Sequence, residues 1–229
     1  MRIHNILLKA REEGRDSLFY TEAKELLADW GIPTAPSKVA RNEGEALHAA
    51  RSIGFPVVMK ILSPDVIHKS DAGGVFTDLR SEADVVEAYA SIEKSLNRIK
   101  PVRMDGVVIE QKLSGVEVSI GVTRDRQFGH VLMFGMGGTL IELLKDTSFR
   151  LIPIESVDAQ EMIKEIKGFP LIEGYRGEKG DLESLKGLLL KVSHLIVQYP
   201  EIIEMDMNPV FNAPSGSTGA DIRIMIERK

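Results

Sequence analysis

The stretch that most constrains this chain runs from Pro56 to Val75 and reads PVVMKILSPDVIHKSDAGGV. An apolar run ends at Lys60, a polar loop follows, and a second strand-like run begins at Val75 after two glycines. Short apolar runs bounded by Ser-Pro and Gly-Gly are typical of buried strands. The stretch therefore predicts two strands joined by a polar loop, with Lys60 at the rim of a sheet.

The same stretch carries residues suited to binding an anion. Lys60 would place a mobile ammonium where it can meet a phosphate. His68 lies in the polar loop before Gly73 and Gly74, whose backbone can approach a ligand closely. Each feature also has an ordinary interpretation, namely an exposed lysine, a structural histidine and a hairpin turn. Both interpretations stay open on this stretch alone.

Segments with helical periodicity alternate with short strand-like runs along the rest of the chain. Helices are predicted over residues 2–13, 18–30, 43–53, 81–98, 159–167 and 182–199. Strands are predicted over residues 38–40, 56–60, 75–79, 106–110, 117–123, 129–134, 149–154 and 202–210. The helix–glycine–strand order predicts an α/β protein, and the alternating strands of the second half favour antiparallel pairing, hence α+β.

Composition narrows the class of protein. The 229 residues suffice for a sizeable core, and the net charge of −5 does not point to nucleic acid or an anionic membrane as a partner. The absence of cysteine excludes disulfides, thiol nucleophiles and Cys-ligated zinc. The apolar runs are shorter than the roughly 20 residues of a bilayer span, and the N-terminus lacks a signal-peptide pattern. A cytoplasmic protein with no nucleic-acid or membrane partner is expected.

Two later motifs suit a nucleotide and a metal. Gly135, Gly137 and Gly138 lack the ending of a Walker loop, and they indicate either a bend close to a ligand or a purely structural one. In the strand IIEMDMNPV, alternate residues Glu204, Asp206 and Asn208 project to one face. Carboxylate and amide oxygens suit Mg²⁺.

Asp221 can add a further carboxylate if the chain returns in a hairpin whose loop is 212–219. The alternative is a half-exposed strand with outward polar residues. Unpaired buried charge is costly, and this favours the metal–phosphate site.

Together, PVVMK…HKSDAGGV, VVIEQKLSGVEVSIGV and EMDMNPV resemble an ATP-grasp domain. More closely, they resemble the β subunits of ADP-forming acetyl-CoA synthetases (acetate–CoA ligases), relatives of the succinyl-CoA synthetase β subunit. The resemblance covers Thr21 to the C-terminus. It implies an ATP-grasp fold in which two α/β subdomains clamp a nucleotide. The implied ranges are N-terminal helices over 1–35, a small lid over 36–112 and a larger subdomain with the magnesium site over 113–229.

The resemblance also implies roles for individual residues. Lys60 and Arg150 would contact phosphate, Glu117 would lie near the ribose, and an adenine hinge would form around Glu110. The implied nucleotide contacts are Lys60, Gly73, Gly74, Glu110, Gln111, Leu113, Glu117 and Arg150. The implied Mg²⁺ ligands are Asp206, Asn208 and Asp221, with ADP or ATP as substrate.

His68 would accept a phosphoryl group from a phosphohistidine on a partner α subunit and pass it to ADP. A neutral imidazole can attack phosphorus and later leave, while Lys60 and Mg²⁺ would offset charge on the transferred group. The resemblance thus implies an acid–thiol ligase that is active only with its α subunit, in an α2β2 assembly.

Two other functions stay open at this point. One is an ATP-grasp carboxylate–amine or carboxylate–thiol ligase without a phosphohistidine. The other is a nucleotide-binding regulatory subunit without catalysis. The position of His68 in a polar, glycine-flanked loop favours the phosphoryl relay.

Overall fold

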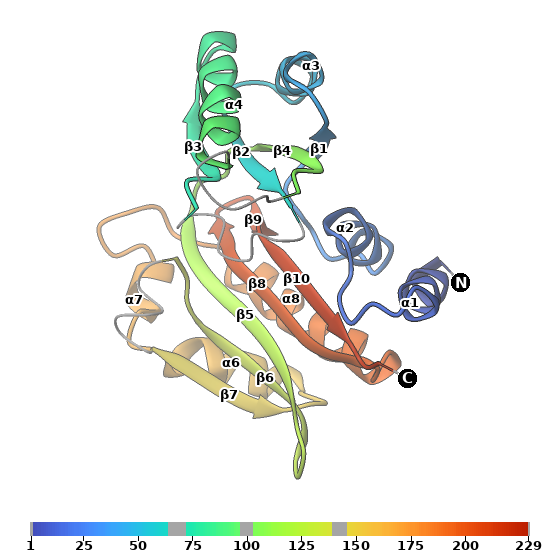
Figure 1. Cartoon of the computed structure of the whole chain (residues 1–229). Helices are drawn as coiled ribbons and strands as arrows, with labels where there is room; N and C mark the ends of the chain where they lie inside the picture. Colours follow the sequence, from blue (N-terminus) through green and yellow to red (C-terminus); the bar gives the residue numbers. More distant parts are fainter. Residues whose placement is uncertain (1, 64–71, 97–102, 139–145, 229) are drawn as a thin grey trace. The chain divides into compact units, whose positions relative to one another are not determined.

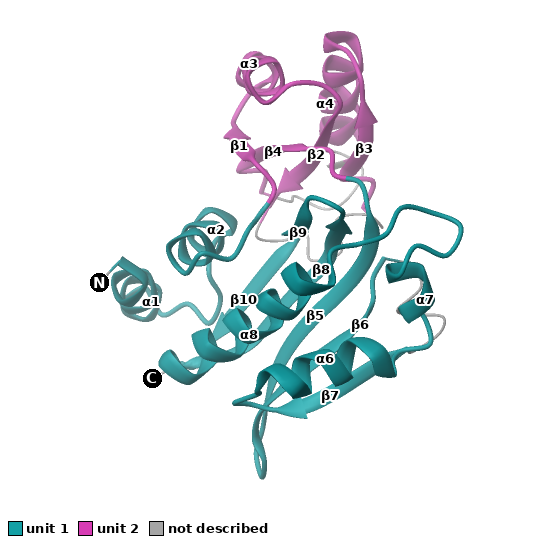
Figure 2. Ribbon diagram, turned by 180° about the vertical axis from the view of Figure 1, so that it is seen from behind, with its two compact units in different colours: residues 1–34, 114–229 teal, residues 35–113 magenta. Residues whose placement is uncertain are grey.

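The computed structural model describes residues 2–63, 72–96, 103–138 and 146–228. The chain forms two compact units, shown in different colours in Figure 2: residues 1–34 with 114–229, and residues 35–113. The ranges expected from the sequence, 36–112 and 113–229, differ from these units by one residue at each boundary. His68 lies outside the described residues.

The smaller unit, residues 35–113, contains a four-stranded antiparallel sheet in the order β1-β4-β2-β3 (Figure 1). Its strands are β1 (Ser37–Ala40), β2 (Val57–Leu62), β3 (Val75–Leu79) and β4 (Gly106–Gln111), and its helices are α3 (Glu43–Ile53) and α4 (Glu82–Leu96). The predicted placement of Lys60 at a strand end is wrong. β2 continues for two residues because it keeps pairing with β4 as far as Gly106.

Alternation along β2 and β4 separates two kinds of side chain in this unit. Met59, Ile61 and Ile109 are fully buried in a core with residues of α3 and α4. Successive side chains of a strand point to opposite faces, so Lys60 and Glu110 lie on the face that the helices do not cover. The Asn42 side chain caps α3 by accepting a hydrogen bond from the Glu45 amide at 2.8 Å, as expected for an N-cap.

The larger unit contains a six-stranded sheet in the order β10-β8-β5-β6-β7, with β9 paired to β8, and all of its pairings are antiparallel. Its strands are β5 (Val116–Asp125), β6 (Gly129–Met136), β7 (Thr147–Leu151), β8 (Ile202–Ala213), β9 (Gly216–Gly219) and β10 (Ile222–Ile226). The predicted loop over 212–219 is wrong, because β8 extends to Ala213 and Val210 pairs with Gly219 of β9.

Helices of the larger unit cover one face of this sheet. They are α1 (Arg2–Glu12), α2 (Tyr20–Asp29), α6 (Ser156–Glu165), α7 (Phe169–Ile172) and α8 (Leu182–Gln198). Helices α6 and α8 lie in front of the sheet in Figure 2 and behind it in Figure 1. The apolar stripe of α8, including Leu189 and Val192, shares one core with Val118 and Ile120 of β5. Polar side chains of β8 lie on the opposite face of the sheet.

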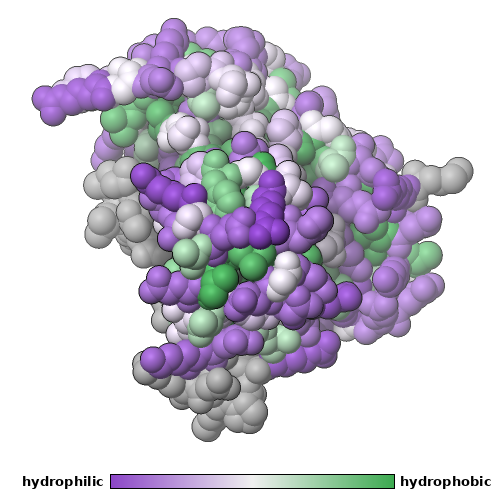
Figure 3. Space-filling model, turned by 90° about the horizontal axis from the view of Figure 1, so that it is seen from above, coloured by the Kyte–Doolittle hydropathy of each residue, from purple (hydrophilic) through white to green (hydrophobic). Residues whose placement is uncertain are grey.

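One face of the molecule (Figure 3) mixes apolar and polar side chains. On the face shown in Figure 3, hydrophobic side chains lie in small patches among hydrophilic ones, which is ordinary for a folded chain in water. Within the described ranges, no helix combines the length and apolar character needed to cross a bilayer.

We expect Leu189→Ala to destabilise the larger unit by about 2–5 kcal/mol, because a fully buried leucine leaves a cavity in a close-packed core. Val197→Ala on the same helix is the matched control, since Val197 is 54% exposed, and it should shift stability by less than about 0.5 kcal/mol. Urea unfolding followed by circular dichroism measures both. Equal shifts for the two variants would contradict the assigned core.

Candidate active site

Strand β8 presents acidic and amide side chains on the sheet face that α6 and α8 leave open. Glu204, Asp206 and Asn208 alternate with the buried Met205 and Met207, as the period of a strand requires. Asp206 pairs with Gly121 of β5 on one side and with Arg223 of β10 on the other. Because Gly121 has no side chain, nothing from β5 covers Asp206 at this register position.

The electrostatics of Asp206 are dominated by burial and by neighbouring negative charge. Its carboxyl group lies among many protein atoms although the residue as a whole is exposed. Burial raises the pKa of Asp206 first, and repulsion from Asp221 and then Glu204 raises it further, while Arg223 acts in the opposite direction. A bound cation would favour the ionised form of Asp206.

Asp221 comes close to β8 through the backbone. The Asn208 amide donates to the Asp221 carbonyl at 3.2 Å, and Asp221 Oδ1 accepts from the Ile222 amide at 3.1 Å. The structure therefore brings together Asp206, Asn208 and Asp221, the three residues expected to bind Mg²⁺. In the described part of the chain, no group of three or more His, Cys, Asp or Glu side chains is arranged to hold a metal. Two carboxylates and the Asn208 carboxamide oxygen are nonetheless hard oxygen donors of the type that Mg²⁺ accepts.

A backbone group that the sequence analysis did not assign also contacts Asn208. The Gly138 amide donates to Asn208 Oδ1 at 3.0 Å, and the preceding Gly137 amide donates to the Glu117 carbonyl at 2.9 Å. The glycine cluster was the available signal, but it did not reveal a partner 70 residues away. Glu117 near the start of β5 and Gly138 just after β6 thus lie together with Asn208 in the middle of β8.

Lys60 and Glu110 form a buried ion pair on the face of the smaller unit's sheet opposite to α3 and α4. Lys60 Nζ lies 2.6 Å from Glu110 Oε2, and the two side chains are 10% and 1% exposed. The sequence analysis assigned the two residues separate roles, as a phosphate contact and as part of the adenine hinge. The structure shows that each supplies the other with its opposite charge, which a buried charge requires.

Other predicted nucleotide contacts lie in the same unit at the ends of its strands. Gly73 has φ of +66°, and the Gly74 carbonyl accepts from the Ile61 amide at 2.7 Å. The Gln111 amide donates to the Pro36 carbonyl at 2.9 Å. Leu113, which is half-buried, ends the unit. The backbone amide of Gln111 is therefore engaged within the sheet.

Arg150 is a predicted phosphate contact within the larger unit that the structure does not bring to the cluster of Asp206, Asn208 and Asp221. It lies on β7 and donates to Glu165 Oε2 at 3.0 Å and to Glu161 Oε2 at 3.4 Å, both on α6. The hydrogen bond and charge of Glu165 raise the pKa of Arg150. Arg150 thus belongs to the face of the sheet that carries the helices.

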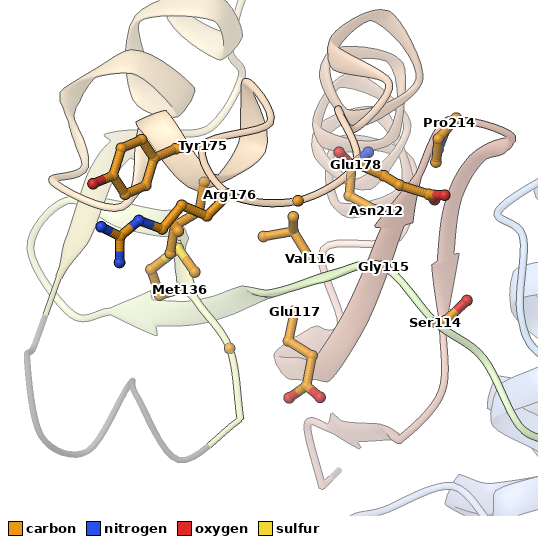
Figure 4. Close-up of a pocket in the computed structure, with 13 residues that line it drawn as sticks. Ser114, Gly115, Val116, Glu117, Met136, Tyr175, Arg176, Glu178, Asn212 and Pro214 are labelled. Carbon is orange, nitrogen blue, oxygen red and sulfur yellow. The ribbon is translucent and has the colours of Figure 1, made fainter.

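A cavity of about 590 Å³ adjoins the Glu117 end of β5. Figure 4 shows Met136 close to Arg176, with Tyr175 beyond it and Val116 nearer the other lining residues. Arg176 has φ of +58°, a backbone conformation that is uncommon for residues other than glycine. The Glu117 side chain points away from Tyr175 and Arg176 (Figure 4). The Arg176 guanidinium lies 5.4 Å from the centre of the Tyr175 ring, and both side chains line the cavity.

Glu110→Ala should destabilise the protein by about 3–5 kcal/mol, because it leaves the Lys60 charge buried without its partner. The double variant Lys60→Met/Glu110→Leu should recover most of that loss, since it removes both charges. Lys112→Met is the matched control: it breaks the exposed Lys112–Asp78 pair of the same unit and should change little. Urea unfolding measures all three, and a double variant no better than Glu110→Ala would count against a paired-charge role.

Asp206→Asn should stabilise the metal-free protein increasingly as pH rises from about 4 towards neutrality. At lower pH, Asp206 is protonated in both states and contributes no cost. As pH rises, the unfolded state ionises first because the folded-state pKa is raised, so the wild type loses stability until the folded state has also ionised. Thermal unfolding of both proteins across this range gives the difference. A difference independent of pH would be inconsistent with the raised pKa.

Comparison with known proteins places this geometry in a family. The ATP-grasp domain family matches residues 9–226. The chain is 45% identical to the β subunit of ADP-forming acetate–CoA ligase I from Pyrococcus furiosus, over 98% of each chain. It is also 45% identical to ADP-forming acetate–CoA ligase II from Archaeoglobus fulgidus, over 91% of this chain but 30% of that longer protein.

Solved structures agree with these matches. Acetyl-coenzyme A synthetase 1 from Ca. Korarchaeum cryptofilum, in complex with coenzyme A and Ca-AMPCP, has a TM-score of 0.93 at 44% identity, over 98% of this chain and 99% of that one. The same enzyme with coenzyme A and Mg-AMPPCP, its phosphohistidine segment pointing towards the nucleotide binding site, has a TM-score of 0.85 at 43% identity, over 98% and 100%. The predicted ATP-grasp fold is confirmed, and the chain belongs to the ATP-grasp family, among the β subunits of ADP-forming acetate–CoA ligases.

Proposed function

We propose that this chain is the nucleotide-binding β subunit of an ADP-forming acyl-CoA synthetase, an acid–thiol ligase that makes ATP from ADP, phosphate and acetyl-CoA or another acyl-CoA. The reaction is reversible. The observation that carries the proposal is the 45% identity over 98% of both chains to a subunit of that name. The cluster of Asp206 and Asn208 on β8 with the neighbouring Asp221 supports it chemically.

The oxygens of Asp206, Asn208 and Asp221 would hold Mg²⁺ with the nucleotide phosphates. When bound, the metal would offset the negative charge that gathers on the transferred phosphoryl group. The raised pKa of Asp206 supports this assignment, because a site with surplus negative charge gains most from a cation. Glu117 would contact the ribose from the start of β5.

Residues of the smaller unit would contact the rest of the nucleotide. Lys60 would donate to a phosphate oxygen, and the ion pair with Glu110 would hold its ammonium in place. The backbone of Glu110, Gln111 and Leu113 would meet the adenine edge, and Gly73 and Gly74 would flank the phosphates. Arg150 is left out of this set, because its contacts are with α6.

His68 would relay the phosphoryl group. One of its ring nitrogens would attack the phosphorus of the partner's phosphohistidine, and the P–N bond on the partner would break. A β-phosphate oxygen of ADP would then attack the same phosphorus, and the P–N bond to His68 would break. The phosphohistidine segment of the Korarchaeum enzyme supports a relay of this kind.

The partner would be an α subunit that carries the CoA-binding domain and the other phosphohistidine. The chain matches 30% of the longer Archaeoglobus relative. That protein therefore carries a region similar to this chain and a larger further region on one polypeptide. We propose an α2β2 assembly in the cytoplasm, since C2-based symmetry is the commonest arrangement of oligomers.

We expect the purified complex with the α subunit to form ATP from ADP, phosphate and acetyl-CoA, and His68→Asn to lower that rate by about 10³-fold or more. The reason is that loss of the relay nitrogen removes a covalent step. Coupled ATP detection measures the rate. The mutated complex must still assemble and bind ADP, which gel filtration and calorimetry check.

Labelling with ³²P separates the remaining functions. The proposal expects an acid-labile, base-stable phosphoryl group on this chain that disappears in His68→Asn. Synthetase activity without any such label would favour a ligase with a direct acyl-phosphate step. Full activity of His68→Asn would mean that this chain only binds nucleotide.

A further inference from the structure

We infer that the Gly137–Gly138 turn at the end of β6 is a positioning device for Asn208, with the Gly138 amide selecting which atom of the Asn208 carboxamide faces the metal. The inference rests on the proposed function, because it assigns a role to residues around the proposed Mg²⁺ ligand. It adds a positioning residue that is not itself a ligand.

The hydrogen bond decides the orientation of the carboxamide. Gly138 N–H donates to Asn208 Oδ1 at 3.0 Å. A carboxamide oxygen has two lone pairs, so one remains for a cation. If the carboxamide turned over, its NH₂ group would face the Gly138 N–H, and two donors cannot bond. The Gly138 amide therefore keeps Oδ1, and not the NH₂ group, on its own side of Asn208, with one lone pair left for a cation.

The two residues of the turn can be only glycine, for reasons of space and backbone angle. A Cβ at position 137 would lie 2.6 Å from the Val118 carbonyl oxygen. At position 138, φ is +61°, and a Cβ would lie 2.2 Å from Glu117 Oε2. At position 137 the contact is with backbone, so a side chain there would push the turn off β5. At position 138 the Glu117 carboxylate can move aside, and it is the positive φ that favours glycine. The closeness that permits the Gly138–Asn208 bond thus depends on the missing side chains.

The consequence is a link between the end of β6 and the metal ligand of β8. Groups that orient metal ligands typically change metal affinity by about 10–100-fold when removed. We expect Gly138→Ala to weaken the Mg²⁺-dependent part of ADP binding by about 10-fold. Binding of ADP without metal would change less, because the Asn208 oxygen has no cation to meet.

The matched control is Gly129→Ala at the first residue of β6, directly after the turn from β5. Gly129 has φ of +81° and open space where its Cβ would be. It therefore imposes a similar backbone strain on the same pair of strands without touching Asn208. Calorimetry of ADP binding gives two dissociation constants for each protein, one without Mg²⁺ and one with it. The ratio used here is the constant without Mg²⁺ divided by the constant with Mg²⁺. Thermal unfolding confirms that both variants are folded.

A smaller ratio in Gly138→Ala than in Gly129→Ala is the expected result, and equal ratios would overturn the positioning role. A wild-type ratio near one would instead refute the metal site of the proposed function. A second measurement uses the metal-free protein: amide exchange by NMR should be slow at Gly138 and faster in Asn208→Ala. Equally fast exchange in the two proteins would show that the hydrogen bond does not form.

Discussion

The antiparallel pairing of β8 with β5 and β10 is the constraint on which the larger unit depends. It sets Asp206 between Gly121 and Arg223, and it buries Met205 and Met207 under the helices. Because side chains alternate along a strand, a slip of one residue would exchange the two sets. Carboxylates would then enter the core and methionines would face solvent, at a large cost in free energy. The core therefore holds the proposed metal ligands in register.

The two units differ in how the negative charge of their acidic side chains is balanced. In the smaller unit, Glu110 is buried against Lys60, so its charge is balanced within the fold. In the larger unit, Asp206 has other carboxylates as its strongest electrostatic neighbours and only Arg223 in opposition. The first arrangement gives a fixed structural pair. The second leaves negative charge that a cation can balance, and a site of this kind binds a ligand at some cost to the stability of the metal-free protein.

Much of the architecture could be predicted from the residue pattern. The helices and strands follow their expected ranges within a few residues, since apolar periods of 3.6 and 2 are local properties. Errors arose where pairing with a distant strand extends an element. β2 continues past Lys60 because β4 faces it, and β9 forms because the end of β8 offers it a partner. In the site, the alternation of Asp206 and Asn208 was visible, whereas the α6 partners of Arg150 were not.

The sequence by itself determined the fold class, the family resemblance and the residue types available for nucleotide and metal. These depend on composition, period and short motifs, all of which are read along the chain. Only the tertiary structure decided which groups meet: Lys60 with Glu110, Arg150 with Glu165, and the Gly138 amide with Asn208. The physical reason is that a hydrogen bond or ion pair acts over a few ångströms in space. Sequence separations of 15, 50 and 70 residues carry no record of such closeness.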